Sequence, residues 1–305
     1  MRWGGRRESG NIEDRRGQEG GFGGIGGGPR LSFPGGGRAG GGLGIGAVAI
    51  ILVVGWFLGI NPMDVLSTMD GSGQVSTGTG SGSQPAGRIG VPSDDPAKFV
   101  SVILADNEDT WGKIFSANSR RYEVPTLVLF TGQTSSACGF ATAASGPFYC
   151  PGDRKVYIDL AFYRELKDKL NAPGDFAQAY VIAHEIGHHV QNLLGTLPKV
   201  EQQRRQASQS EGNRLTVRLE LQADCYAGVW GHSANQRGLL DPGDIDEALN
   251  AASQIGDDTL QRRTQGRVVP DSFTHGTSEQ RSRWFKRGFA DGNISACDTF
   301  GASQL

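Results

Sequence analysis

Two histidines and a glutamate in one short segment could hold and use a metal ion. His184 and His188 lie four residues apart in the segment HEIGH, so a helix would place both imidazoles on one face. Glu185 lies next to them and could take a proton from a water molecule. This spacing predicts a zinc site in which His184 and His188 are ligands and Glu185 is a general base.

A catalytic zinc site needs a third protein ligand and one open position. The segment ELQAD supplies Glu220 and Asp224, which share a helix face because they are four residues apart. We expect Glu220 to be the third ligand, and Asp224 to accept a hydrogen bond from a ligand histidine. The reverse assignment, with Asp224 on the metal, is the alternative.

Three more histidines need a role. His189 follows His188 directly, so it points about 100° away around the helix, and we expect it to have a packing role. His232 lies near a predicted helix end among small and polar residues, where a surface role is expected. His275 precedes a predicted helix and, with Arg281, could stabilise the oxyanion of a peptidase reaction. A role for His275 in helix capping or in the core is the alternative.

The elements that carry these residues predict a helix-rich α+β domain with a small sheet. The central helix should have Asp175 as its N-cap and stop at Gly195, because apolar residues recur between them with a helical period. Short runs of β-branched and aromatic residues predict two strands. The predicted strands are 126–130 and 155–160, and further helices are predicted from 95–96 onward and over 161–170, 213–232, 244–255 and 278–290, with a polar helix or loop over 198–212.

The chain before this domain predicts a membrane anchor. No charged residue occurs from Ala39 to Met63, and residues 43–60 would span about 27 Å as a helix, close to the thickness of a bilayer core. A buried core helix and a cleaved signal peptide are the alternatives. We predict a disordered Gly/Arg-rich leader over 1–42, a transmembrane helix over 43–62, a Gly/Ser-rich linker over 63–93 and the catalytic domain over 94–305.

Basic residues in the leader predict the orientation of that helix. Seven arginines lie within residues 1–38, and the positive-inside rule keeps such a segment in the cytoplasm. We therefore expect a single-pass protein of the inner (cytoplasmic) membrane, with a cytoplasmic N-terminus and an extracytoplasmic catalytic domain.

Several long stretches of the sequence resemble the bacterial neutral zinc metallopeptidase family, whose members are single-span membrane proteins. The resemblance extends over nearly the whole chain, through MRWGGRRESGNIEDRRG, CGFATAASGPFYCPGDRKVYIDLAF, AYVIAHEIGHHVQNLLG, RLELQADCYAGVW and FTHGTSEQRSRWFKRGF. The motif order HExxH, ExxAD and TH-x5-R is also similar, more distantly, to gluzincin membrane proteases such as the CAAX-prenyl protease. These likenesses imply a zincin-like domain of gluzincin type that binds Zn²⁺, with motif residues at His184, Glu185, His188, Glu220, Asp224, His275 and Arg281. The likeness to the gluzincin proteases, and not the helical spacing, is what favours Glu220 over Asp224 as the third ligand.

The four cysteines fit an extracytoplasmic location, where thiols meet an oxidising environment. Four cysteines allow three pairings. We favour Cys138–Cys150, which closes a short loop, together with Cys225–Cys297, which would tie the Glu220 helix to the C-terminal tail. Buried free thiols or a second metal site are the alternatives.

The composition and the motifs together favour an enzyme. A formal net charge of −2 argues against nucleic-acid binding. Structural zinc sites usually have four protein ligands rich in cysteine, whereas this site offers three ligands and a glutamate in the position of a base. We predict a membrane-anchored zinc metallopeptidase that binds a peptide or protein substrate along the strand at 155–160 or the segment at 148–150. A membrane-tethered zinc scaffold without catalysis, or a zinc amidase acting on cell-wall peptide, is the alternative.

Overall fold

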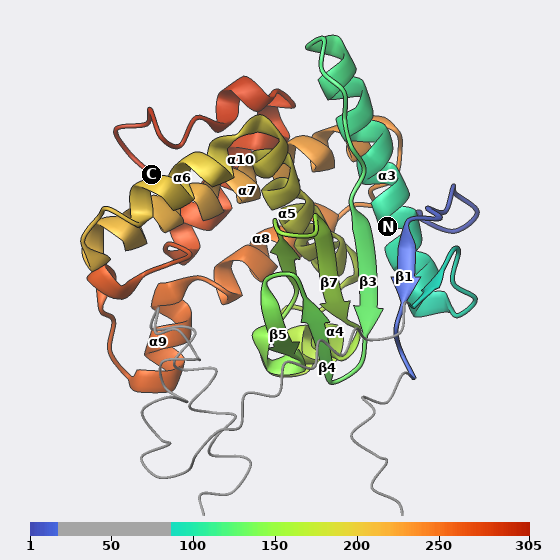
Figure 1. Ribbon diagram of the computed structural model, residues 1–305, viewed down its shortest axis with the longest axis horizontal. Coiled ribbons are helices and arrows are strands. Elements are labelled where there is room, and N and C mark those ends of the chain that lie inside the picture. Colours follow the sequence, from blue (N-terminus) through green and yellow to red (C-terminus); the bar gives the residue numbers. More distant parts are fainter. Residues whose placement is uncertain (18–86) are drawn as a thin grey trace, which may run out of the picture.

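A computed structural model describes residues 1–17 and 87–305 and shows a helix-rich α+β fold with small sheets, as predicted (Figure 1). The strands are β1 (Ile12–Asp14), β2 (Arg88–Ile89), β3 (Thr126–Phe130), β4 (Gln133–Ser136), β5 (Gly139–Thr142), β6 (Phe148–Cys150) and β7 (Lys155–Asp159). The α-helices are α3 (Asp95–Ala117), α4 (Ala161–Asp168), α5 (Asp175–Leu194), α6 (Thr196–Arg204), α7 (Gln209–Gln236), α8 (Asp244–Gln254), α9 (Asp257–Gln265) and α10 (Ser278–Asp291).

Five of the strands form one mixed sheet, in the order β2-β1-β3-β7-β6. The three inner strands β1, β3 and β7 are parallel, and β2 and β6 pair with them antiparallel at the two edges. The sequence of β3, TLVLF, is apolar without alternation and almost entirely buried, as is typical of a parallel strand covered on both faces. Strands β4 and β5 form a separate antiparallel hairpin.

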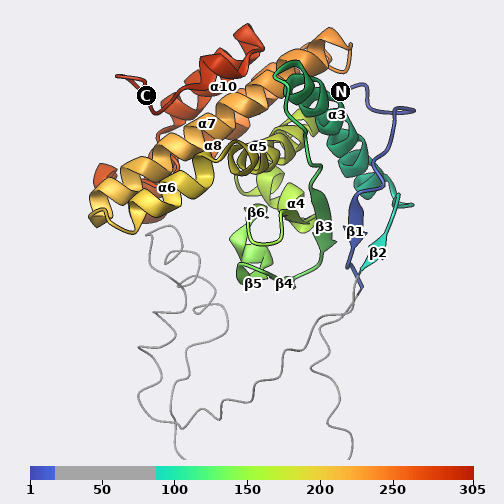
Figure 2. The same ribbon diagram turned by 45° about the horizontal axis from the view of Figure 1, so that its top comes forward.

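The central helix α5 lies between the sheet and the long helix α7, and α10 packs on the far side of α7 (Figure 2). Two glycines allow the close helix contacts. A Cβ atom on Gly187 of α5 would lie 3.0 Å from the carbonyl oxygen of Ala223 in α7, and one on Gly288 of α10 would overlap the carbonyl oxygen of Cys225. A larger residue at either glycine would push the helices apart, so these positions set the spacing around the predicted site.

Residues 1–17 correct one prediction, because they are folded rather than disordered. Ile12 is completely buried in the main apolar core, and β1 pairs with both β2 and β3. The high Gly and Arg content of residues 1–42 as a whole favoured a prediction of disorder. The charged residues next to this short strand form their ion pairs and hydrogen bonds only in the folded domain. Residues 18–42 of the predicted leader lie outside the described residues.

The predicted transmembrane helix at 43–62 and most of the predicted linker also lie outside the described residues. Within residues 1–17 and 87–305, no helix is long and apolar enough to cross a membrane.

Most predicted boundaries agree with the structure to within a few residues, and the differences have local causes. Asp175 is the first residue of α5 rather than its N-cap, because Gly174 takes the cap position with a positive φ of 121°. Gly195 ends the helix in the left-handed conformation, as predicted. Phe148–Cys150, for which no strand was predicted, forms the edge strand β6.

Both predicted disulfides are present. Cys138, in the turn between β4 and β5, is bonded to Cys150 of β6. Cys225 of α7 is bonded to Cys297 near the C-terminus. All four cysteines are therefore paired, and the alternatives of free thiols or a second cysteine metal site are wrong.

Candidate metal centre

Helices α5 and α7 bring together three side chains that could bind a metal ion. His184 and His188 lie one turn apart on α5, and Glu220 faces them from α7. The Nε2 atom of His184 is 3.2 Å from Oε2 of Glu220, and the Nε2 atom of His188 is 3.4 Å from Oε1. The ligand atoms of all three residues lie within 4.8 Å of one another. The structure thus assembles the three predicted ligands into one possible metal site.

Hydrogen bonds on the outer side of each imidazole orient the two rings. The Nδ1 atom of His184 lies 2.8 Å from Oδ1 of Asp224. The Nδ1 atom of His188 lies 2.9 Å from Oε1 of Gln191, whose amide group donates to the carbonyl oxygen of Leu219. Each Nδ1 therefore carries a proton, so Nε2 is the ring atom that could bind a metal, once it has released any proton of its own.

The donor spacing fits a tetrahedral zinc ion. Ligand atoms about 2.0–2.1 Å from such an ion lie about 3.3–3.4 Å from one another. The two measured separations are 3.2 and 3.4 Å. Two imidazoles and one carboxylate also make up a donor set found in catalytic zinc sites. The residues present therefore fit Zn²⁺.

Buried carboxylates make the cluster favourable for a cation. Burial by itself would lower the pKa of His184, but the neighbouring Asp224 and Glu220 raise it to about 10. Burial would raise the pKa of Glu220, but His188 and His184 hold it well below its usual value. The pKa of Asp224 is also lowered, to about 2, so both carboxylates stay ionised and favour a cation beside them.

Glu185 lies beside the two ligand histidines on α5 and is almost completely buried. Burial raises the pKa of Glu185, and the nearby His188 and His184 oppose that effect. A carboxylate in such surroundings holds a proton more readily than one in water, which suits a group that takes up and returns a proton.

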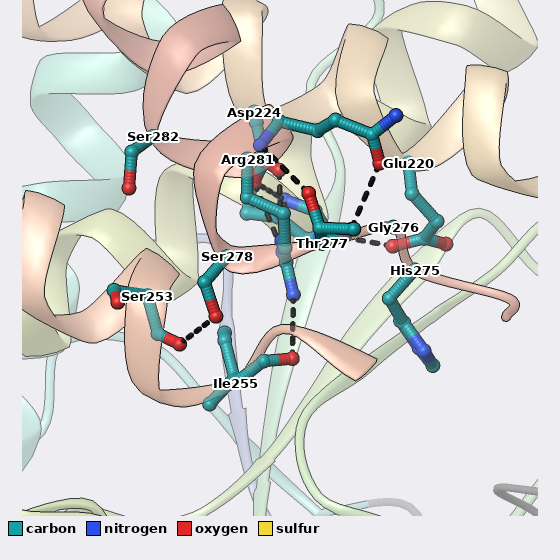
Figure 3. Close-up of polar contacts among 12 residues, drawn as sticks. Glu220, Asp224, Ser253, Ile255, His275, Gly276, Thr277, Ser278, Arg281 and Ser282 are labelled. Carbon is teal, nitrogen blue, oxygen red and sulfur yellow. Dashed lines mark hydrogen bonds and ion pairs between the residues drawn. The ribbon is translucent and has the colours of Figure 1, made fainter. Parts of the chain in front are cut away.

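Asp224 contacts both His184 and the buried Arg281, and Figure 3 shows its contact with Arg281. Its Oδ1 accepts hydrogen bonds from the hydroxyl of Tyr180 at 2.5 Å and from Nη2 of Arg281 at 2.9 Å, and its Oδ2 accepts from Nε of Arg281 at 2.8 Å. The guanidinium also donates to the carbonyl oxygen of Ile255 at 3.3 Å. Arg281 was expected beside the reacting oxyanion, but it lies behind His184 because its planar fork pairs with Asp224.

The position of Asp224 also bears on the choice of the third ligand. Its carboxylate faces Nδ1 of His184, on the side of the ring opposite the metal-facing Nε2. This geometry favours Glu220 as the ligand and Asp224 as the acceptor of the histidine N–H, and it disfavours the reverse assignment.

His275 lies next to Glu220, in the loop before α10 (Figure 3). The buried carboxylate of Asp257 accepts hydrogen bonds from the backbone amides of residues 274–276 at 2.6–2.9 Å, and its Oδ1 lies 3.3 Å from Nδ1 of His275. The N-cap of α10 is Thr277, so His275 does not cap that helix. The loop is therefore held against α9, and His275 lies near enough to Glu220 to help lower the pKa of that carboxyl.

The other two histidines lie away from the cluster. The Nδ1 atom of His189 lies 3.1 Å from the hydroxyl of Tyr149, and its Nε2 atom lies 2.6 Å from the carbonyl oxygen of Glu123. Burial lowers the pKa of His189 to about 4, so the ring is neutral near pH 7. The Nδ1 atom of His232 lies 2.7 Å from the carbonyl oxygen of Phe289.

Three residues of this site were not predicted: Tyr180, Gln191 and Asp257. Tyr180 lies four residues before His184 and Gln191 three residues after His188, so helical spacing could have placed both beside the ligands. Asp257 reaches His275 only through the packing of α9 against the loop, and no sequence spacing indicates that contact.

Comparisons with known proteins match the chain to one protein family. Residues 1–300 match the family described as "Putative neutral zinc metallopeptidase". The "Uncharacterized protein YpfJ" of Escherichia coli K12 is 53% identical over 303 residues, which cover 99% of this chain and all of that protein. The "Uncharacterized protein Rv2575" of Mycobacterium tuberculosis H37Rv is 40% identical over 222 residues, which cover 69% of this chain and 74% of that protein. No solved structure matches the chain significantly.

Proposed function

Because the chain belongs to the neutral zinc metallopeptidase family, we propose that it hydrolyses peptide bonds in a zinc-dependent reaction. The observation that carries this proposal is the convergence of two imidazole Nε2 atoms on Glu220, at 3.2 and 3.4 Å, with Glu185 beside them. His184, His188 and Glu220 would hold the ion, which is the ligand set of a gluzincin. When bound, zinc would act as a Lewis acid that lowers the pKa of water and polarises the substrate carbonyl.

The proposed roles of the other residues follow from where they lie. Glu185 takes a proton from the attacking water and later returns it to the leaving amine. His275 donates a hydrogen bond to the carbonyl oxygen as that oxygen gains negative charge. Asp224, with its two hydrogen bonds from Arg281, orients His184 and does not touch the substrate.

We propose strand β6 as the place where the substrate backbone binds. Of the two segments considered from the sequence, β7 has paired strands on both sides, whereas β6 has only β7 as a partner in its sheet. The side-chain amide of Asn192 on α5 donates a hydrogen bond of 2.9 Å to the hydroxyl of Tyr149 on β6. Strand β6 therefore lies against α5, the helix that carries His184 and His188. An extended peptide could add to that edge as a further antiparallel or parallel strand.

Location also belongs to this proposal. Two disulfides favour an oxidising compartment outside the cytoplasm. Attachment to a membrane depends on the apolar residues 43–62, which lie outside the described residues, and it stays a prediction from the sequence.

The proposal can be tested with the purified full-length chain and a matched pair of variants. Glu185→Gln removes the proposed base, and Glu279→Gln makes the same change at an exposed position of α10. Zinc is measured by elemental analysis, and activity is measured on a mixed peptide library that includes cell-wall peptides. We expect one zinc per chain in all three proteins, and a loss of rate of about 10²–10⁴-fold in Glu185→Gln alone.

Three outcomes would overturn or change the proposal. A Glu185→Gln variant that cleaves like the wild type would refute the role as general base. A folded wild-type protein that takes up no zinc would refute a zinc metallopeptidase and favour a non-enzymatic protein. Cleavage confined to the cell-wall peptides would replace the protein substrate by the amidase alternative.

A further inference from the structure

The first 17 residues form an inner part of the fold. Strand β1 lies between β2 and β3, and its side chain Ile12 is completely buried in the main core. The backbone amide of Leu127 donates to the carbonyl oxygen of Asn11 at 2.9 Å, and that of Arg15 donates to the carbonyl oxygen of Leu129 at 2.8 Å. Without this segment, one side of β3 would lose its hydrogen-bonding partner, and the core around Ile12 would be open to water.

The residues before β1 are bonded to helix α3. The hydroxyl of Ser9 and the side-chain amide of Asn11 both donate hydrogen bonds to Oε1 of Glu108, at 2.6 and 2.8 Å. The guanidinium of Arg7 donates to Oε2 of the same carboxylate from two nitrogen atoms, each at 3.0 Å. Ser9 is completely buried, so this is a specific contact and not a loose surface association.

The first described part ends, and the second begins, at the same end of the neighbouring strands β1 and β2. Asp14 of β1 is directly opposite Arg88 of β2, and the backbone amide of Gly87 donates to Oε1 of Glu13 at 3.2 Å. The departing residue Gly17 and the returning residue Gly87 therefore belong to one small region of the folded domain.

We infer that residues 1–17 and 87–305 fold as a single unit and that no membrane separates them. Strand pairing, ion pairs and core contacts require atoms to touch, whereas a bilayer core is about 30 Å thick. The predicted orientation, with residues 1–42 in the cytoplasm and residues 94–305 outside it, is incompatible with these contacts. This inference does not depend on catalysis, so it can fail or succeed independently of the proposed function.

The first experiment compares the sidedness of the two segments in the full-length protein in cells. All four natural cysteines are in disulfides, so single cysteines can be introduced as probes at Gly4→Cys and Gln203→Cys, both of which are exposed. Intact cells are treated with a membrane-impermeant maleimide, and permeabilised cells serve as the control in which both sites react. Equal labelling of the two cysteines in intact cells, whether both react or neither does, supports the inference. Labelling of only one of them overturns it.

The second experiment tests the contact itself in the purified full-length chain. Ile12→Asp places a charge in the core, whereas the matched control Ile89→Asp changes an isoleucine of the neighbouring strand that is 75% exposed. We expect the melting temperature to fall by about 5–10 °C in Ile12→Asp and to change little in Ile89→Asp. If Ile12→Asp does not fold at all, Ile12→Ala gives a smaller measurable drop. A wild-type melting temperature in both Ile12 variants would overturn the inference.

Discussion

The candidate metal centre and the N-terminal strand are both assembled from distant residues, but only the candidate metal centre could be predicted. His184 and Glu220 are 36 residues apart, and each lies on a long helix whose four-residue spacing already indicates a shared face. Glu13 and Lys155 are 142 residues apart, and Glu13 lies on a strand of three residues. The difference shows that residues on one helix face can be recognised from their spacing in the sequence. A short strand, in contrast, can be recognised only from the strands with which it pairs.

The two regions nevertheless contain the same kind of ion pair. In each, a buried carboxylate is held by positive side chains: Asp224 by Arg281 in the metal centre, and Glu13 by Arg15 and Lys155 in the sheet. Asp224 is completely buried and also binds a ligand histidine, while the cations around Glu13 are partly exposed. We therefore expect the pair at the metal centre to contribute more to stability than the group in the sheet, and to affect zinc binding as well.

The largest stability effect is expected from Asp224→Ala. This change leaves the buried guanidinium of Arg281 without its anion, so the free energy of unfolding should fall by about 3–5 kcal/mol. His184 also loses the acceptor that fixes its tautomer, so zinc affinity should fall by about 10–100-fold. Urea denaturation and competition with a chelator measure the two quantities.

Asp246→Ala is the control for this prediction, because it removes an exposed aspartate from α8. It should change neither quantity appreciably. An Asp224→Ala variant that loses stability but keeps its full zinc affinity would show that the carboxylate supports the fold and not the ligand. That result would mean that the buried carboxylates of both regions act on stability alone.

Predictions succeeded where local signals were strong. The caps and apolar periods gave α5, α8, α10, β3 and β7 close to their observed bounds, and motif spacing gave the cluster of His184, His188 and Glu220. Helix α9 was missed because its sequence, DDTLQRRTQ, has a single large apolar residue and no readable period. Strand β6 was missed because proline and glycine flank its three residues closely and mask the strand signal.

Predictions failed where a side chain has a choice of partners. Arg281 had the charge to stabilise an oxyanion, but it pairs with Asp224, which only the packing of α10 on α7 brings near. Ile12 is a lone apolar residue among charged and small ones, so its sequence context is typical of a disordered segment. Its burial depends on the pairing of β1 with β3, which no local sequence pattern could reveal.

A smaller effect, and one that depends on pH, is expected from Glu13→Gln. Burial would raise the pKa of Glu13, but hydrogen bonds from Arg15 and Lys155 lower it to about 2, from an unperturbed 4.5. Because the folded-state pKa is the lower one, the stabilisation is complete above about pH 4.5 and is lost as the pH falls toward 2. Because solvent screens the partly exposed cations around Glu13, we expect Glu13→Gln to cost about 1–2 kcal/mol at pH 7, and the two proteins to converge in stability near pH 2.

The control for this prediction is Glu165→Gln, which breaks an exposed pair with Lys169 on α4 and should cost less than about 1 kcal/mol. The measurement is the denaturation midpoint between pH 2 and pH 7. If Glu13→Gln is as mild as Glu165→Gln at pH 7, the first strand is not held as firmly as its contacts indicate. A difference between wild type and Glu13→Gln that does not depend on pH would contradict the lowered pKa.

The smallest effect is expected from Asp257→Asn, which tests whether a tertiary contact outside any motif reaches the proposed chemistry. The amide can still accept from the backbone of residues 274–276, but it no longer provides a negative charge for Nδ1 of His275. We expect kcat to fall by about 10-fold, or about 1.4 kcal/mol, with little change in KM or zinc content. If Asp257 acts through His275, adding Asp257→Asn to His275→Gln should cause no further loss. A full additional 10-fold loss in the double variant would show that Asp257 acts on the loop alone, and His275 would then lose its proposed positioning partner.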